Sequence, residues 1–125
     1  MKVRNPLHPA ISLALLVLIS VLFVLANAAG AAGKEKVIQI TAKRFEYSPS
    51  EITIKKGIPV VLEFTSLDVR HGFNCPGLGV RTDIYPQKVT RLRIVPEKAG
   101  TFSFHCDIFC GSGHEDMMGK INIIE

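Results

Sequence analysis

The chain has 125 residues, a hydrophobic fraction of 47% and a formal net charge of +4. This length is enough for one domain and little else. The 15 Lys and Arg residues form no cluster of the kind that binds nucleic acid, so the sequence excludes a protein that binds nucleic acid through a basic patch. The basic pairs Lys43–Arg44 and Lys55–Lys56 flank expected strands, and we interpret both as solvated surface.

The N-terminal region carries a targeting pattern. Lys2 and Arg4 precede residues 10–26, which contain no charged side chain, and small residues spaced A-x-A follow. This order is typical of a signal peptide, and we expect one over residues 1–28. A single retained membrane anchor is the alternative, because an uncharged, largely apolar stretch of 17 residues lies at the lower limit for crossing a bilayer. Either way, we expect the domain in the periplasm or at the outer face of the cytoplasmic membrane.

The remainder of the chain reads as β-structure. Residues 29–35 form an expected linker, and residues 36–125 form an expected all-β domain. Short segments with apolar residues at alternate positions, separated by turn residues, are typical of a β-sandwich. The expected strands, in chain order, are residues 37–42, 51–55, 59–66, 88–95, 101–106 and 119–124.

The segment between the last two expected strands concentrates metal-binding side chains. Within residues 106–117 the sequence places two cysteines, one histidine and one methionine, and glycines that let the backbone bend tightly. Thiolate, imidazole and thioether donors together favour copper over magnesium or calcium. A weak Met ligand is a copper habit more than a zinc one. A further imidazole comes from His71, which follows the expected strand 59–66.

Three cysteines in an exported protein cannot all pair with one another. A mononuclear blue-copper site needs only one thiolate, whereas Cys106 and Cys110 together could bridge two copper ions. A disulfide between these two residues, or a redox-active dithiol, is the alternative. We interpret Cys75 as a buried free cysteine that packs like a small apolar residue.

Three motifs carry a family resemblance. They are Asp-Val-Arg-His-Gly-Phe at 68–73, Pro-Gly-Leu-Gly-Val-Arg-Thr-Asp-Ile-Tyr-Pro at 76–86, and Cys-x3-Cys-x3-His-x2-Met at 106–117. Together they resemble the cupredoxin domain of cytochrome c oxidase subunit II, and nitrous oxide reductase carries a similar binuclear CuA centre. The resemblance covers roughly residues 36–125 and implies a cupredoxin-like Greek-key β-sandwich.

The resemblance also implies a site and a function. The implied copper ligands are His71, Cys106, the backbone carbonyl of Ile108, Cys110, His114 and Met117. Both thiolates would bridge two copper ions that share one transferable electron. The implied function is electron transfer from a donor such as cytochrome c to an oxidase subunit I or another reductase, with no catalysis by this chain alone.

The chain departs from the family pattern in three respects. Ile108 stands where the oxidase subunit typically has a glutamate that helps to bind magnesium, the chain has no Trp, and it has at most one membrane span. Two alternative functions therefore stay open: a periplasmic copper chaperone or storage protein, and a mononuclear blue-copper protein. We expect partner docking to centre on Ile108 and Phe109. The expected acidic rim around this centre consists of Asp68, Asp83, Asp107, Glu115 and Asp116.

Two residues beside the ligands have different expected places. Strand alternation directs the side chain of His105 to the face opposite Cys106. Met118 competes with Met117 as the thioether ligand, and the family spacing favours Met117.

Overall fold

The computed structural model describes residues 13–20 and 35–125. Residues 13–20 are helical, and no helix among the described residues has the length and apolarity needed to cross a membrane. Most of the expected signal peptide or anchor, and nearly all of the expected linker 29–35, lie outside the described residues. The compact unit that carries the candidate site spans Glu35–Glu125.

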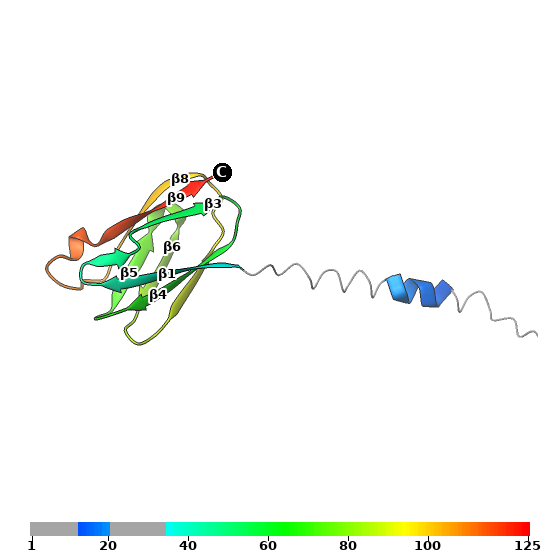
Figure 1. Cartoon of the computed structure of the whole chain (residues 1–125), viewed down its shortest axis with the longest axis horizontal. Coiled ribbons are helices and arrows are strands. Elements are labelled where there is room, and N and C mark those ends of the chain that lie inside the picture. Colours follow the sequence, from blue (N-terminus) through cyan, green and yellow to red (C-terminus); the bar gives the residue numbers. More distant parts are fainter. Residues whose placement is uncertain (1–12, 21–34) are drawn as a thin grey trace, which may run out of the picture. The chain divides into compact units, whose positions relative to one another are not determined.

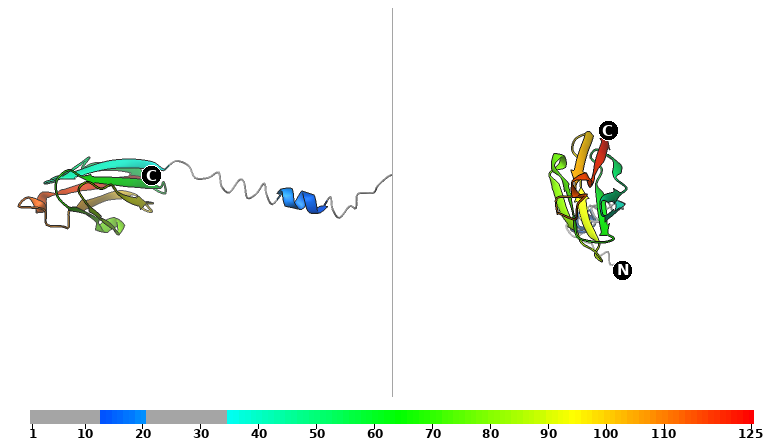
Figure 2. Two further views of the ribbon diagram at one scale, coloured as in Figure 1. Left: turned by 90° about the horizontal axis from the view of Figure 1, so that it is seen from below. Right: turned by 90° about the vertical axis from the view of Figure 1, so that its left-hand side faces the viewer.

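Residues 35–125 fold into two β-sheets that pack as two layers (Figures 1 and 2). The first sheet has the strand order β2-β1-β4-β7 and the second has the order β3-β9-β8-β5-β6. The strands of the first sheet are β1 (Lys36–Lys43), β2 (Glu46–Ser48), β4 (Val60–Ser66) and β7 (Thr90–Ile94). Those of the second are β3 (Glu51–Lys55), β5 (His71–Cys75), β6 (Val80–Ile84), β8 (Gly100–His105) and β9 (Met118–Ile124).

The structure confirms the expected β-sandwich and corrects its details. Two short 3-10 turns, η2 (Pro76–Leu78) and η3 (His114–Asp116), interrupt an otherwise β-structured domain. Both sheets are mixed, because β1 pairs with β4 and β3 pairs with β9 in parallel. The alternation of apolar residues predicts six of the nine strands and leaves out β2, β5 and β6. Strand β5 shows no alternation because four of its five residues are buried, and β2 and β6 lie at sheet edges, where a strand needs no continuous apolar face.

The core follows from strand alternation. Along β4, every second side chain, beginning with Val60, is buried and faces the opposite sheet. The rings of Phe64, Phe73 and Phe104 pack in sequence, with centroids 4.7 Å and 4.9 Å apart. Because each is fully buried, each contributes roughly 1.5–3 kcal/mol from removal of apolar surface from water.

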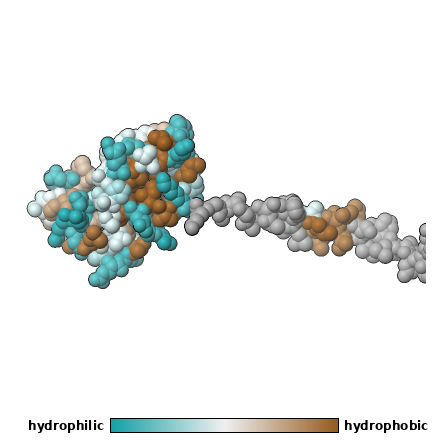
Figure 3. All heavy atoms as spheres, in the orientation of Figure 1, coloured by the Kyte–Doolittle hydropathy of each residue, from teal (hydrophilic) through white to brown (hydrophobic). Residues whose placement is uncertain are grey.

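The loop between β8 and β9 lies at one end of the sandwich, opposite the end where the C-terminus and the start of β1 lie (Figure 1). The β4–β5 connection reaches the same end. On the face seen in Figure 3, polar residues border the area where apolar residues gather. Phe73 lies two residues after His71 and Phe104 two residues before Cys106, so two of these packed rings lie close in sequence to candidate metal-binding residues.

Candidate metal centre

Sheet order brings the metal-binding residues together. His71 begins β5, Cys106 directly follows β8, and Met117 directly precedes β9. Strand β8 lies between β5 and β9 in one sheet and runs antiparallel to both. The start of β5, the end of β8 and the start of β9 therefore meet at one end of the sheet. The loop between β8 and β9 is long enough to fold back over that end and add Cys110 and His114 to the group.

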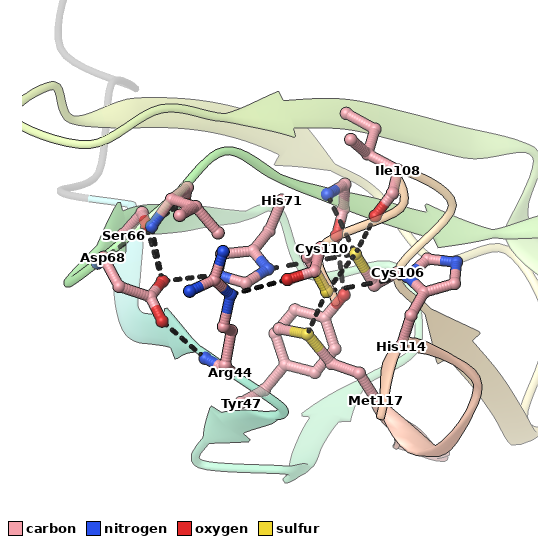
Figure 4. A network of polar contacts seen from close by, with 12 residues as sticks. Arg44, Tyr47, Ser66, Asp68, His71, Cys106, Ile108, Cys110, His114 and Met117 are labelled. Atoms are coloured by element: carbon pink, nitrogen blue, oxygen red, sulfur yellow. Dashed lines mark hydrogen bonds and ion pairs between the residues drawn. The ribbon is translucent and has the colours of Figure 1, made fainter. Parts of the chain in front are cut away.

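Two cysteine sulfurs form the middle of the site (Figure 4). The Sγ atoms of Cys106 and Cys110 are 4.0 Å apart, about twice the length of a disulfide bond, and all three cysteines of the chain are free. His71 Nδ1 lies 4.0 Å from Cys106 Sγ. On the other side, His114 Nδ1 lies 3.6 Å from Cys110 Sγ. The two thiols therefore stand between two imidazoles.

Two further donors complete the group. Met117 Sδ is 3.9 Å from Cys110 Sγ, and the backbone oxygen of Ile108 is 3.2 Å from Cys106 Sγ. Met117 is fully buried, whereas the neighbouring Met118 is 56% exposed. The donor atoms of His71, Cys106 and Cys110 all lie within 4.8 Å of one another. The structure thus gathers all six expected ligands at one place.

Asp68 fixes the orientation of the His71 ring. Its Oδ1 lies 2.7 Å from His71 Nε2, and this contact leaves Nδ1 facing the sulfurs. Partial burial opposes ionisation of Asp68, but hydrogen bonds from the Arg44 backbone N–H, the His71 ring and the Val69 N–H outweigh it and lower its pKa to about 2. An ionised carboxylate behind a ligating imidazole holds the ring in place and makes it a better donor.

Gly72 and Tyr47 fix the backbone beside Cys106. The Gly72 N–H donates to Cys106 Sγ at 3.3 Å, and the buried Tyr47 hydroxyl donates to the Gly72 carbonyl at 2.6 Å. A Cβ on Gly72 would lie 1.9 Å from Asp107 Oδ1, so any other residue at this position would force the Asp107 side chain to move. Burial is the main cause that raises the pKa of Tyr47, and the neighbouring Cys106 adds to it. The hydroxyl therefore stays protonated and keeps donating.

Arg44 is exposed, as the interpretation of solvated surface expects, but it also binds the ligand loop. Its Nε donates to the Cys110 carbonyl at 2.6 Å, and its backbone N–H donates to Asp68 Oδ2 at 2.8 Å. The next residue, Phe45, packs on the ligand loop, where a Cβ at Gly113 would lie 2.5 Å from its ring. The short turn between β1 and β2 thus holds both ligand-bearing segments.

Two acids of the expected rim, Asp83 and Asp107, are paired with arginines, whereas Glu115 and Asp116 are exposed. Arg81 binds Asp107 through two hydrogen bonds of 2.8 Å and 3.1 Å, and it also pairs with Asp83. Arg70 pairs with the same Asp83. The Arg70 and Arg81 guanidiniums hold the pKa of Asp83 at about 2, against the opposing effect of its partial burial. These pairs tie the start of the ligand loop to β6 instead of presenting free negative charge.

The donor set suits copper. It combines two thiols, two imidazoles and a thioether, which are soft to borderline ligands. Burial is the main cause that raises the pKa of Cys110 to about 11, and the neighbouring Cys106 adds to it. The Cys110 thiol is therefore protonated at neutral pH when no metal is bound. Metal binding at this site therefore displaces protons. Cys75 is fully buried on β5, and burial raises its pKa.

The comparisons with known proteins agree with this geometry. A family described as "Cupredoxin-like domain" matches residues 14–122. The chain belongs to the cupredoxin family. This cupredoxin is related to cytochrome c oxidase subunit 2 of Thermus thermophilus, with 32% identity over 88 residues, which are 70% of this chain and 65% of that protein. It is 30% identical over 93 residues to nitrous-oxide reductase of Ralstonia nicotianae, covering 71% of this chain and 14% of the reductase.

Two solved structures of oxidase subunits or domains resemble this cupredoxin in fold. A chain of a heme-copper terminal oxidase dimer matches 92% of this chain and 97% of its own length, with a TM-score of 0.65 and 26% identity. The periplasmic domain of cytochrome oxidase subunit II from Bradyrhizobium japonicum shares the fold, with a TM-score of 0.66 at 21% identity, covering 72% of this chain and 84% of that domain. The cupredoxin spans 65% or less of the length of the two curated relatives. The predicted resemblance is confirmed.

Proposed function

We propose that this cupredoxin is an electron-transfer protein with a binuclear copper centre of CuA type. One observation carries the proposal: two buried thiols lie 4.0 Å apart, and each has an imidazole nitrogen within 4.0 Å. A mononuclear blue-copper site uses a single thiolate. A second buried thiol with its own imidazole supplies a second set of donors, as two ions that share bridging sulfurs require.

Each residue of the centre has a role in this proposal. Cys106 and Cys110 would bridge the ions as thiolates, and His71 and His114 would each bind from one side. Met117 and the carbonyl of Ile108 would be weak ligands. When bound, the copper pair supplies a one-electron redox centre.

The contribution of the protein is rigidity and exclusion of water. His71 is fully buried and held by Asp68. Tyr47 fixes Gly72, and Arg44 fixes the Cys110 carbonyl. Ligands held by surrounding hydrogen bonds do not need to reorganise when the charge of the site changes, which lowers the barrier to electron transfer.

The partners and location belong to the same proposal. A donor such as cytochrome c would deliver electrons, and an oxidase subunit I or another reductase would receive them; two relatives are named cytochrome c oxidase subunit 2 and nitrous-oxide reductase. Phe109 is 79% exposed beside the centre and would form the middle of the docking surface. We place the domain in the periplasm or on the outer face of the cytoplasmic membrane, exported by a signal peptide over residues 1–28 or held by an anchor through residues 10–26.

Two experiments test this function. In the first, Cys106→Ser should abolish the intense colour of the copper-loaded chain and change its copper content, whereas Cys75→Ala, a buried cysteine outside the donor group, should preserve both. If Cys106→Ser keeps colour and copper content, the centre is not thiolate-bridged. In the second, stopped-flow mixing with reduced cytochrome c distinguishes a carrier from a copper chaperone. Rapid oxidation of the cytochrome supports the carrier, and its absence supports the chaperone.

A further inference from the structure

A histidine and a methionine face each other on the outer side of the sheet, next to the metal centre. His105 of β8 and Met118 of β9 are directly paired in the antiparallel register. The adjacent pair is joined by a hydrogen bond from the Cys106 N–H to the Met117 carbonyl, at 3.0 Å. Along two antiparallel strands, residue pairs that exchange backbone hydrogen bonds alternate with pairs that do not. His105 and Met118 therefore form a pair without backbone hydrogen bonds, in which the Cα atoms are only about 4.5 Å apart.

Strand alternation separates this pair from the centre. Cys106 and Met117 are buried and point inward. His105 and Met118 are their direct neighbours and therefore point to the opposite face of the sheet. Their side chains share that face and lie close enough to bind one small ion between them.

The two side chains line a common hollow. This hollow has a volume of about 450 Å³ and is also lined by Cys106, His114 and Glu115. It therefore borders both the outer pair and two of the candidate ligands. Glu115 is exposed and adds a negative charge to the lining, which attracts cations.

Met118 is unusual for its surroundings. The next two outward residues of β9 are polar and engaged: Lys120 pairs with Glu51, and Asn122 forms hydrogen bonds with Glu51 and Thr101. A thioether that is 56% exposed contributes little to the core. Beside an imidazole, however, it completes a soft-to-borderline donor pair that suits Cu(I) better than harder cations.

We propose that His105 and Met118 form an outer Cu(I)-binding site that receives copper and passes it to the ligand loop. His105 would bind through a ring nitrogen and Met118 through its sulfur, and Glu115 would attract the incoming ion. The ion would then move through the hollow to His114, which lines it, and from there to the inward-facing thiols, without a change of oxidation state. The site goes beyond the proposed electron transfer, because it loads a centre of one or of two copper ions equally well.

The direct test counts Cu(I) bound by the full chain in competition with a chromophoric Cu(I) chelator. Met118→Leu removes the sulfur at nearly constant volume, and His105→Asn removes the imidazole. Each variant should bind one Cu(I) fewer than the parent, whatever number the inner centre holds. Ser103→Ala is the matched control, since Ser103 lines the same hollow but offers no soft donor, and it should bind as many ions as the parent. Equal counts for the parent and Met118→Leu would overturn the proposal.

A second measurement separates this site from the inner centre. In a Cys106→Ser, Cys110→Ser double variant whose circular dichroism matches the parent, one Cu(I) should remain, and adding Met118→Leu should remove it. In chains with an intact centre, Met118→Leu should slow filling by Cu(I) several-fold and leave the final absorbance unchanged. Unchanged filling rates would overturn the relay role. Loss of all Cu(I) in the double cysteine variant would overturn the outer site, but it would leave the proposed electron transfer untouched.

Discussion

The contact between Arg44 and the ligand loop can be isolated by a single substitution. Arg44→Met removes the guanidinium that donates to the Cys110 carbonyl at 2.6 Å, but it keeps the backbone N–H that donates to Asp68. The carbonyl is then left in a partly buried position without this donor. A hydrogen bond from a charged donor contributes about 1.5–3 kcal/mol, and the exposure of Arg44 places this one near the lower limit. We therefore expect the free energy of unfolding to fall by about 1.5 kcal/mol.

Urea unfolding of the metal-free full chain measures this change. Lys43→Met is the matched control, because Lys43 pairs with Glu46 through side chains that are more than half exposed. This substitution should change the free energy of unfolding by less than about 0.5 kcal/mol. Hydrogen exchange of the amides in the 106–117 loop should accelerate in Arg44→Met only. If the two variants unfold at the same urea concentration and exchange alike, the guanidinium does not hold the loop and the reasoning is refuted.

Three other substitutions probe neighbouring features. Tyr47→Phe leaves the Gly72 carbonyl without its buried donor and should cost about 1–3 kcal/mol in urea unfolding; no loss would contradict that role. Asp83 has a pKa of about 2 in the fold, below the ordinary value of about 3.9. Ionised Asp83 therefore stabilises the fold at pH values above its ordinary pKa, and the stability advantage of the parent over Asp83→Asn should disappear as the pH falls toward 2. A difference in stability that stays constant with pH would contradict this. Cys75→Ala should lower stability but leave copper content unchanged in elemental analysis, and a lower content would make Cys75 a ligand.

The donor-rich loop was predictable because its information is local. Cys106, Cys110, His114 and Met117 lie within twelve residues, and a loop between two strands keeps such residues close. Alternation along β3 and β4 likewise predicts which side chains are buried. His71 required the family motif, because its distance from the loop depends on β5 lying beside β8.

The residues that support the site were not predictable from local patterns. Arg44 and Cys110 are 66 positions apart, and Tyr47 reaches Gly72 across 25 positions. In sequence, Arg44 is one half of an ordinary basic pair. Asp83 and Asp107 look like free acids in the sequence until the fold places Arg81 beside both. Such contacts depend on which distant strands become neighbours, and apolar alternation does not specify that.

The copper content and electron paramagnetic resonance spectrum of the reconstituted full chain test the central claim most directly. The chain is loaded with copper, freed of excess metal, and analysed for copper and protein in the same sample, with weakly held Cu(I) removed by a mild chelator. The account predicts two copper ions per chain in the inner centre, a purple colour, and a hyperfine pattern with more than four lines from an electron shared by two copper nuclei. A single copper ion with a four-line pattern would contradict it.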